Sequence, residues 1–179
     1  VLGVGSTWLP VLAAGRFGQS GFSVEGFDAA PGADTTAGMN VIGEGFFDAV
    51  GVPLLAGRAF TESDTGGAPQ VAIVNESFAR KFNVGRDVGK RLGFGTTTNY
   101  GVEIVGIVAD SKLGALKRGV PPTVHLPRRQ WAGQVFSMFY YVRTGVDPEI
   151  LLAQIPRVVA EIDPEVPVTS LQTMATEVT

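Results

Sequence analysis

The chain has 179 residues, of which 45% are hydrophobic and 17% charged, with 24 glycines, 11 prolines and no cysteine. This length fits one ordinary domain or two small ones, and the glycine and proline content predicts many turns and short elements. The net charge of −3, with no basic cluster larger than Lys117–Arg118 or Arg128–Arg129, argues against nucleic-acid binding, and the lack of cysteine excludes disulfides, thiolate nucleophiles and cysteine-based zinc sites.

No apolar run approaches the ~18–20 residues that cross a bilayer. The chain opens with Val1, and its first ten residues contain no basic segment ahead of an apolar stretch. At the other end, TMATEVT stops just as a helix begins. We therefore expect a soluble fragment of a longer protein.

The first third of the chain carries little helix signal. Residues 22–27, FSVEGF, alternate apolar and polar side chains and predict a strand, and residues 39–42 predict a second strand. Residues 44–50 predict a short helix that ends at Gly51, because glycine accepts the left-handed conformation of a helix C-terminus. Pro53 then prevents the helix from resuming.

Residues 71–82, VAIVNESFARKF, place several polar groups directly after an apolar run. Val71–Val74 predicts a short strand that is buried on both faces. Asn75 suits the N-cap of a following helix, and Glu76 suits its first turn, where the helix dipole favours negative charge. Capping and dipole compensation thus explain Asn75, Glu76 and Ser77 without catalysis, and we predict structural roles for them.

The middle of the chain predicts three further strands, at residues 88–94, 102–110 and 121–127. The glycine-rich segment 93–101, GFGTTTNYG, is similar to a phosphate-binding loop, but its glycines join two strands and present no helix N-terminus. We therefore expect a hairpin connection at residues 95–101. Leu113–Leu116 predicts a helical turn. The last of these strands, PPTVHLP, is flanked by prolines, which suits the edge of a sheet.

The last third predicts a β-α-β run of the split, ferredoxin-like kind. Residues 135–144 and 166–171 predict the strands. The helix between them starts with Asp147 as N-cap and Pro148 in its first turn, and Pro156 is expected to kink it. The residues expected to form its buried stripe are Leu151, Ile155, Val158, Val159 and Ile162.

These elements predict an α+β fold with a discontinuous organisation. We expect residues 1–66 and 134–179 to form one lobe of β-α-β units, and residues 67–133 to form an inserted small α/β lobe. The segments 51–53 and 66–69, which contain glycine and proline, are candidate hinges between the lobes.

Candidate chemistry is sparse. His125 is the only histidine, no G-x-S-x-G motif is present, and one histidine cannot build a histidine-based metal site without several carboxylates, so we interpret His125 as a structural residue near a strand edge. GVGS at residues 3–6 lacks the spacing and context of a dinucleotide fingerprint. Asp64, Glu103 and Asp110 lie in separate elements without calcium-loop spacing, so we interpret them as solvated turn residues.

Arg58 and Asp64 flank Phe60 in the segment AGRAFTESD. An ion pair between these two side chains would fix the turn. A buried bidentate pair would hold the junction between the lobes more firmly than an exposed pair. We therefore predict a structural role for this pair near that junction.

Several segments, taken together and in order, resemble one family. They are GFFDAVGVPLLAGRAFTESD, VAIVNESFARKF, VGKRLGF, VEIVGIVAD, VHLPRRQ and YYVRTGVDPEILLAQIPRVVAEIDPEVPVTSLQTM. They are similar to the MacB-like periplasmic core domain of ABC transporter permeases of the FtsX-like, MacB type. The resemblance runs from about Gly45 to Met174, and the first forty residues match only loosely.

The resemblance implies an extracytoplasmic domain, in the periplasm of a bacterium, between the first two transmembrane helices of a permease. It implies a porter-like lobe with an inserted small lobe, a cytoplasmic ATPase subunit or domain as partner, a dimeric parent, and a periplasmic adaptor or substrate protein as a further partner. It carries over no catalytic, cofactor-binding or metal-binding residue. We therefore expect a non-enzymatic domain that couples conformational change to export or to partner binding. The alternatives are an extracytoplasmic small-molecule-binding sensor module and a small hydrolase.

Overall fold

The computed structural model of the chain describes residues 1–11, 18–112, 119–134 and 137–177. Nine strands in these ranges share one sheet. They are β1 (Gly3–Thr7), β2 (Gly18–Val24), β3 (Thr36–Ile42), β4 (Leu54–Gly57), β5 (Val71–Asn75), β6 (Arg91–Phe94), β7 (Val102–Val108), β8 (Thr123–Pro127) and β9 (Phe139–Arg143). The helices are α1 (Phe46–Val50), α2 (Glu76–Lys81), α3 (Arg128–Trp131), the 3₁₀ turn η1 (Ala132–Gln134), α4 (Pro148–Ile162) and α5 (Met174–Glu177). The α+β class predicted from the sequence is therefore confirmed.

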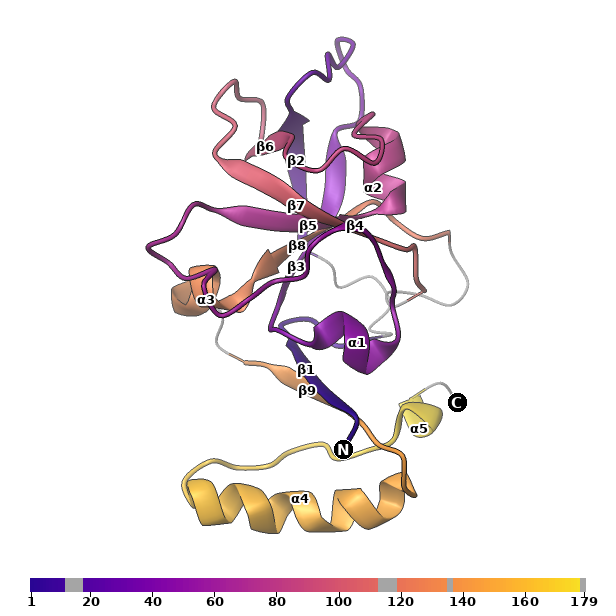
Figure 1. Cartoon of the computed structure of the whole chain (residues 1–179), viewed down its shortest axis with the longest axis vertical. Helices are drawn as coiled ribbons and strands as arrows, with labels where there is room; N and C mark the ends of the chain where they lie inside the picture. The colour runs from indigo at the N-terminus through magenta and orange to yellow at the C-terminus, as the bar shows by residue number, and fades with distance from the viewer. Residues whose placement is uncertain (12–17, 113–118, 135–136, 178–179) are drawn as a thin grey trace.

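Six of the strands close into a ring. Their order is β2-β6-β7-β5-β8-β3, and an additional antiparallel pairing of β2 with β3 joins the two ends. The pairings of β3 with β8 and of β5 with β7 are parallel, and the others in the ring are antiparallel. Ring closure removes the free edges that an open sheet would expose. We call these six strands the barrel (Figure 1).

Apolar side chains at alternating positions of the barrel strands form the first core. This arrangement follows from the period of two in a strand, which sends alternate side chains to one face. Helix α2 contributes Phe78, and its C-cap is Phe82; the two rings stack with centroids 4.3 Å apart. The buried residues of the first core include Phe22, Val24, Val41, Ala72, Val74, Leu92, Val102, Ile104, Val124 and Leu126.

A second core lies where α1 packs against the outer face of the barrel. Its buried residues are Val11, Ile42, Phe46, Phe47, Val52, Phe60, Val71, Ile73, Val105 and Val108. Helix α1 ends as predicted: Gly51 is left-handed with φ 72°, and its N–H reaches the carbonyl groups of Phe47 and Asp48. The same short helix also packs on β1 and β9, so it lies between the barrel and those two strands.

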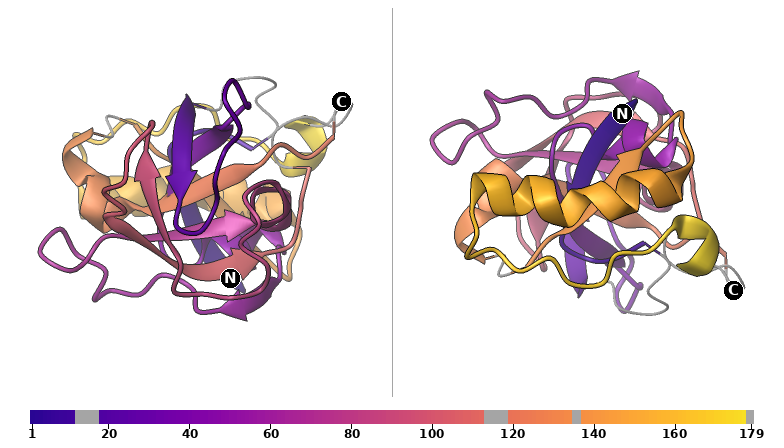
Figure 2. Two further views of the ribbon diagram at one scale, coloured as in Figure 1. Left: turned by 90° about the horizontal axis from the view of Figure 1, so that it is seen from above. Right: turned by 90° about the horizontal axis from the view of Figure 1, so that it is seen from below.

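Strands β1 and β9 pair along their whole length, and we call them the β1–β9 ribbon. The ribbon leaves the barrel at one point, the pairing of Thr7 with Ile42 in β3. Helix α4 lies beyond the ribbon, at the end of the molecule opposite the barrel (Figure 1). Seen from below, α4 crosses the molecule and the following segment runs back beside it (Figure 2). No helix in the described ranges is long and apolar enough to span a membrane.

Strands β1 and β4 were not predicted. The sequence of β1, GVGST, has weak strand propensity, and the strand forms because β9 supplies a pairing partner along its whole length. Its glycines serve packing instead: a Cβ atom on Gly5 would lie 2.4 Å from the Cα atom of Phe46. Close approach of α1 to the ribbon therefore requires glycine at this position.

The predicted buried stripe of α4 is wrong. The helix begins at Pro148 with Asp147 as its cap, as expected, and runs through Pro156 without a break. None of its residues is buried, and Val158 and Ile162 are 48% and 81% exposed. The strand predicted at residues 166–171 is also absent from the described structure. An alternating apolar pattern needs a neighbouring strand to complete its hydrogen bonds, and this segment pairs with none.

Pairing within the sheet joins the two predicted lobes. Strand β2 pairs with β6, β3 with β8, and β4 with β7. The division into a lobe of residues 1–66 with 134–179 and an inserted lobe of residues 67–133 stays a prediction. Its hinge segment 66–69 is anchored, because Gln130 Nε2 donates to the carbonyl oxygen of Pro69 at 2.8 Å. The predicted helical turn at residues 113–116 lies outside the described residues.

Candidate functional site

The polar group that follows β5 begins with a buried asparagine. Asn75 Oδ1 accepts the N–H of Phe78 at 3.0 Å, which confirms the predicted N-cap. The same oxygen accepts the N–H of Thr123 at 2.8 Å, and Nδ2 donates to the carbonyl oxygen of Pro121 at 2.9 Å. Asn75 therefore starts α2 and also holds the beginning of β8, a second role that local sequence spacing does not reveal.

The next residues of this group gather around Asp110. Its carboxylate accepts the N–H and the hydroxyl of Ser77 at 2.8 and 2.7 Å, and a guanidinium N–H of Arg80 at 2.6 Å. Glu76 accepts the N–H of Asp110 at 3.2 Å. Burial alone would raise the pKa of Asp110, but the hydrogen bonds from Ser77 and Arg80 outweigh it and lower that pKa. A carboxylate saturated with donors is a weak proton acceptor, so this cluster ties β7 to α2.

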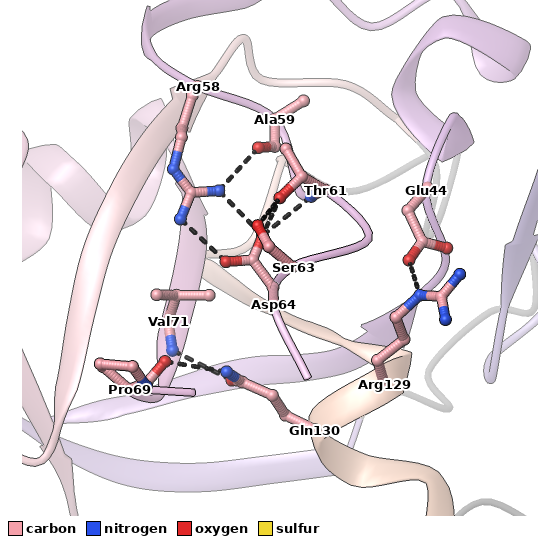
Figure 3. A network of polar contacts seen from close by, with 10 residues as sticks. All are labelled: Glu44, Arg58, Ala59, Thr61, Ser63, Asp64, Pro69, Val71, Arg129 and Gln130. Carbon is pink, nitrogen blue, oxygen red and sulfur yellow. Dashed lines mark hydrogen bonds and ion pairs between the residues drawn. The ribbon is translucent and has the colours of Figure 1, made fainter. Parts of the chain in front are cut away.

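A second cluster closes the turn after β4 (Figure 3). Arg58 makes two parallel hydrogen bonds to Asp64, each 2.8 Å long, and the N–H of Thr61 donates to Asp64 at 2.8 Å. The hydrogen bonds from Arg58 lower the pKa of Asp64, against the effect of burial. The predicted ion pair is confirmed. The interpretation of Asp64 as a solvated turn residue is wrong, because it is only 4% exposed.

Side chains of α3 contact both the start of β5 and the residues just before α1 (Figure 3). Gln130 Oε1 accepts the N–H of Val71 at 3.1 Å, so the side chain completes the start of β5. Arg129 forms an ion pair with Glu44, the residue that precedes α1 by one glycine. Sequence reasoning missed both contacts, because no local pattern links residues separated by 59 and 85 positions.

His125 does not lie at a sheet edge, and that prediction is wrong. Strand β8 is central, with β5 on one side and β3 on the other. The flanking prolines, Pro121 and Pro127, lie outside or at the end of the strand, so they remove no hydrogen bond from its interior. The ring of His125 is buried and meets Phe47 edge-on, with centroids 5.1 Å apart. Burial lowers the pKa of His125 to about 4.

The remaining candidate loops have structural roles. Residues 95–101 join β6 to β7, and Leu92 of β6 pairs with Val102 of β7, as the hairpin prediction required. The glycines of GVGS belong to β1. Within the described residues, no group of three or more histidine or carboxylate side chains is arranged to hold a metal ion.

The opposite end of the molecule is apolar and exposed. Helix α4 contributes three exposed apolar side chains, Ile150, Val158 and Ile162. The β1–β9 ribbon adds Val4, Phe139, Tyr140 and Val142. Monomeric soluble proteins rarely expose large contiguous apolar patches unless these bind another surface. We call these seven residues the apolar end, and their exposed side chains suit contact with another surface.

Comparisons with known proteins agree with this description. The family model of the MacB-like periplasmic core domain matches residues 9–158. The crystal structure of the periplasmic region of MacB from Actinobacillus actinomycetemcomitans has a TM-score of 0.54 and 15% identity, covering 89% of this chain and 84% of that one. The extracellular domain of the ABC-type transporter YknZ from Gram-positive bacteria has a TM-score of 0.50 and 15% identity, covering 90% of this chain and 95% of that one. At these identities the structures share the fold, and no curated protein matches the sequence.

Proposed function

Because the chain belongs to the MacB-like periplasmic core domain family of ABC transporter permeases, we propose that it performs no chemistry of its own. In this proposal the domain couples conformational change in the permease to substrate export or to binding of a partner protein. It lies on the extracytoplasmic side of the membrane, continuous with the transmembrane helices, and a cytoplasmic ATPase supplies the energy.

The apolar end is the observation that carries this proposal. The barrel has a closed core, whereas the neighbouring ribbon and α4 leave apolar side chains in water, with Ile162 81% exposed. Burying apolar surface stabilises association by about 25 cal/mol per Å² before the costs of ordering. A domain with a closed barrel core and exposed apolar side chains at its other end suits the transmission of a movement through contact.

The carboxylates support the same proposal. Every described carboxyl group with a displaced pKa has that pKa lowered, and each of them holds a hydrogen bond or ion pair. A general acid needs the opposite displacement, toward neutral pH. The groups concerned are Asp34, Glu44, Asp64 and Asp110.

A distance measurement in the parent permease, reconstituted with its ATPase, tests the coupling. The chain contains no cysteine, so Gln154→Cys on α4 and Arg86→Cys on an exposed barrel loop place two spin labels at known positions in a cysteine-free parent. We expect the distribution of distances between the labels to shift when ATP is trapped on the ATPase. A label pair at Arg86→Cys and Thr98→Cys, both within the barrel, serves as the matched control and is expected to stay constant.

Two results would count against the proposal. One is a distance distribution between α4 and the barrel that is identical in nucleotide-free, ATP-bound and ADP-bound states. The other is turnover of a substrate by the purified domain that is lost in Glu76→Gln or His125→Gln, because that would make the domain an enzyme.

A further inference from the structure

His125 is a buried titratable side chain that borders the second core. It lies on β8 in register with Asn40 of β3 and Ile73 of β5, and its ring meets Phe47 of α1. Its neighbours in the strand, Val124 and Leu126, face the first core instead. The imidazole is therefore enclosed between the outer face of the barrel and α1.

One nitrogen of this ring has no partner. His125 Nδ1 is buried and makes no hydrogen bond to any described residue. In the neutral ring this nitrogen can serve as an acceptor that goes unused, but a protonated ring carries N–H groups on both nitrogens. Protonation would thus create a buried charge and an unsatisfied donor together, and burial is the sole cause of the low pKa of His125.

In the described elements around the second core, the nearby charged groups are engaged elsewhere or not buried. Asp64, in the turn with Phe60, is held by Arg58, and Glu103 of β7 is half-buried. Strands β3, β5 and β8 contain no other titratable residue. The charged side chains of helices α1, α2 and α3 are not buried. They are Asp48, Glu76, Arg80, Lys81, Arg128 and Arg129. Glu44, which precedes α1, is held by Arg129. Relief of a charge on His125 must therefore come from movement.

We propose that His125 makes the packing of α1 on the barrel sensitive to acid, so that uptake of a proton by the ring releases α1 from the second core. Helix α1 is the element that gives way, because it has only five residues and one edge-on aromatic contact with the ring. Strands β3 and β5, on the other sides, are fixed in the closed barrel.

Release of α1 would also loosen the ribbon. Phe46 meets Tyr141 of β9 with centroids 6.2 Å apart, and Gly5 of β1 lies against the backbone of Phe46. Apart from α1, the described contacts between the ribbon and β3 gather at one corner. There Thr7 pairs with Ile42 and accepts a hydrogen bond from Asn40 Nδ2 at 2.7 Å. Proton uptake by His125 would therefore let the apolar end move about this corner without unfolding the barrel. The acid-sensitive release of α1 involves only residues of this chain and does not depend on the proposed coupling to a permease.

Hydrogen exchange of single amides at pH 7.5 and pH 5.0 tests whether acid releases α1. The rates are first corrected for the intrinsic pH dependence of exchange. The probes are the amides of Ala49 and Val52, which are bonded to Gly45 and Phe47, and the reference is β7. The pKa of His125 is 6.5 when α1 is open and about 4 when it is closed, so the open state binds the proton more readily. Between pH 7.5 and pH 5.0 the equilibrium constant for opening of α1 should therefore rise roughly 30-fold. Because α1 opens locally, low concentrations of denaturant should leave its exchange unchanged, unlike that of β7.

Matched variants show whether the pH response of α1 depends on His125. His125→Leu should abolish the 30-fold response, and His125→Gln replaces it if the leucine variant does not fold. Asp48→Asn, which removes the only carboxylate of α1, should keep the response. The proposal is overturned if α1 exchanges with the protection and denaturant dependence of β7, or if the response persists without His125.

Discussion

Replacing Asn75 with alanine tests the role of the junction between β5 and α2. The substitution removes both acceptor bonds at Oδ1 and the donor bond from Nδ2, and it leaves the N–H groups of Phe78 and Thr123 without their partner. Both groups lie in buried residues, so water cannot easily replace the lost acceptor. The carbonyl group of Pro121 belongs to an exposed residue and can turn to water instead.

The magnitude follows from these two buried donors. Leaving a buried polar group unsatisfied costs about 1–3 kcal/mol, and loss of an N-cap alone costs about 1 kcal/mol. The third bond adds little, because its acceptor reaches solvent. We therefore expect Asn75→Ala to lower the free energy of unfolding by about 3 kcal/mol, measured by urea denaturation at pH 7.5.

Two variants serve as controls for this estimate. Ser77→Ala removes the hydroxyl bonds to Asp110 and from Arg80 in a partly exposed cluster, where water can replace them, and we expect a loss of about 1 kcal/mol. Asn75→Asp keeps the acceptor for both N–H groups and should be less damaging than alanine. If Asn75→Ala changed stability by no more than Ser77→Ala, the reasoning that Asn75 joins α2 to β8 through buried bonds would be refuted.

Three further predictions concern the other end of the molecule and its pH dependence. Gly5→Ala should cost about 1–3 kcal/mol in urea denaturation, because its Cβ atom meets the backbone of Phe46, whereas Gly67→Ala, in open space, should be neutral. The pKa of His125 is lower in the folded chain than the 6.5 of the unfolded chain, so its contribution to stability is complete above pH 6.5 and falls as pH drops toward 4. We therefore expect the free energy of unfolding to fall by about 2 kcal/mol between pH 7.5 and 5.0. This loss should be absent in His125→Gln. Equal pH dependence of the two proteins would contradict this assignment. Ile162→Ser should change the stability of the isolated chain by less than about 0.5 kcal/mol, because the side chain is 81% exposed, yet it should weaken the ATP-dependent distance change in the permease.

Sequence reasoning succeeded where the signal is local. The cap at Asn75, the end of α1 at Gly51 and the start of α4 at Pro148 each depend on residues within one helical turn. The pair of Arg58 and Asp64 also lies within one short segment. Backbone conformation and side-chain hydrogen bonding over such distances leave few alternatives, so the residue types are sufficient to predict the contact.

Sequence reasoning failed where the outcome depends on elements far apart in the chain. The apolar positions of α4 predict a buried stripe, but burial requires a second surface, and the described chain supplies none for Ile162. The prolines around β8 suggest an edge, but β3 and β5 flank the strand on both sides. The segment 166–171 has the pattern of a strand and lacks the neighbour that would pair with it.

The sequence by itself therefore determined the class of fold, the capped ends of its helices and the family resemblance. The tertiary structure alone decided that six strands close into a barrel, that His125 is buried against Phe47, and that α4 remains exposed. The physical reason is that helix caps and turns are set by neighbouring residues, whereas burial belongs to pairs of surfaces. Which surfaces meet depends on the path of the whole chain.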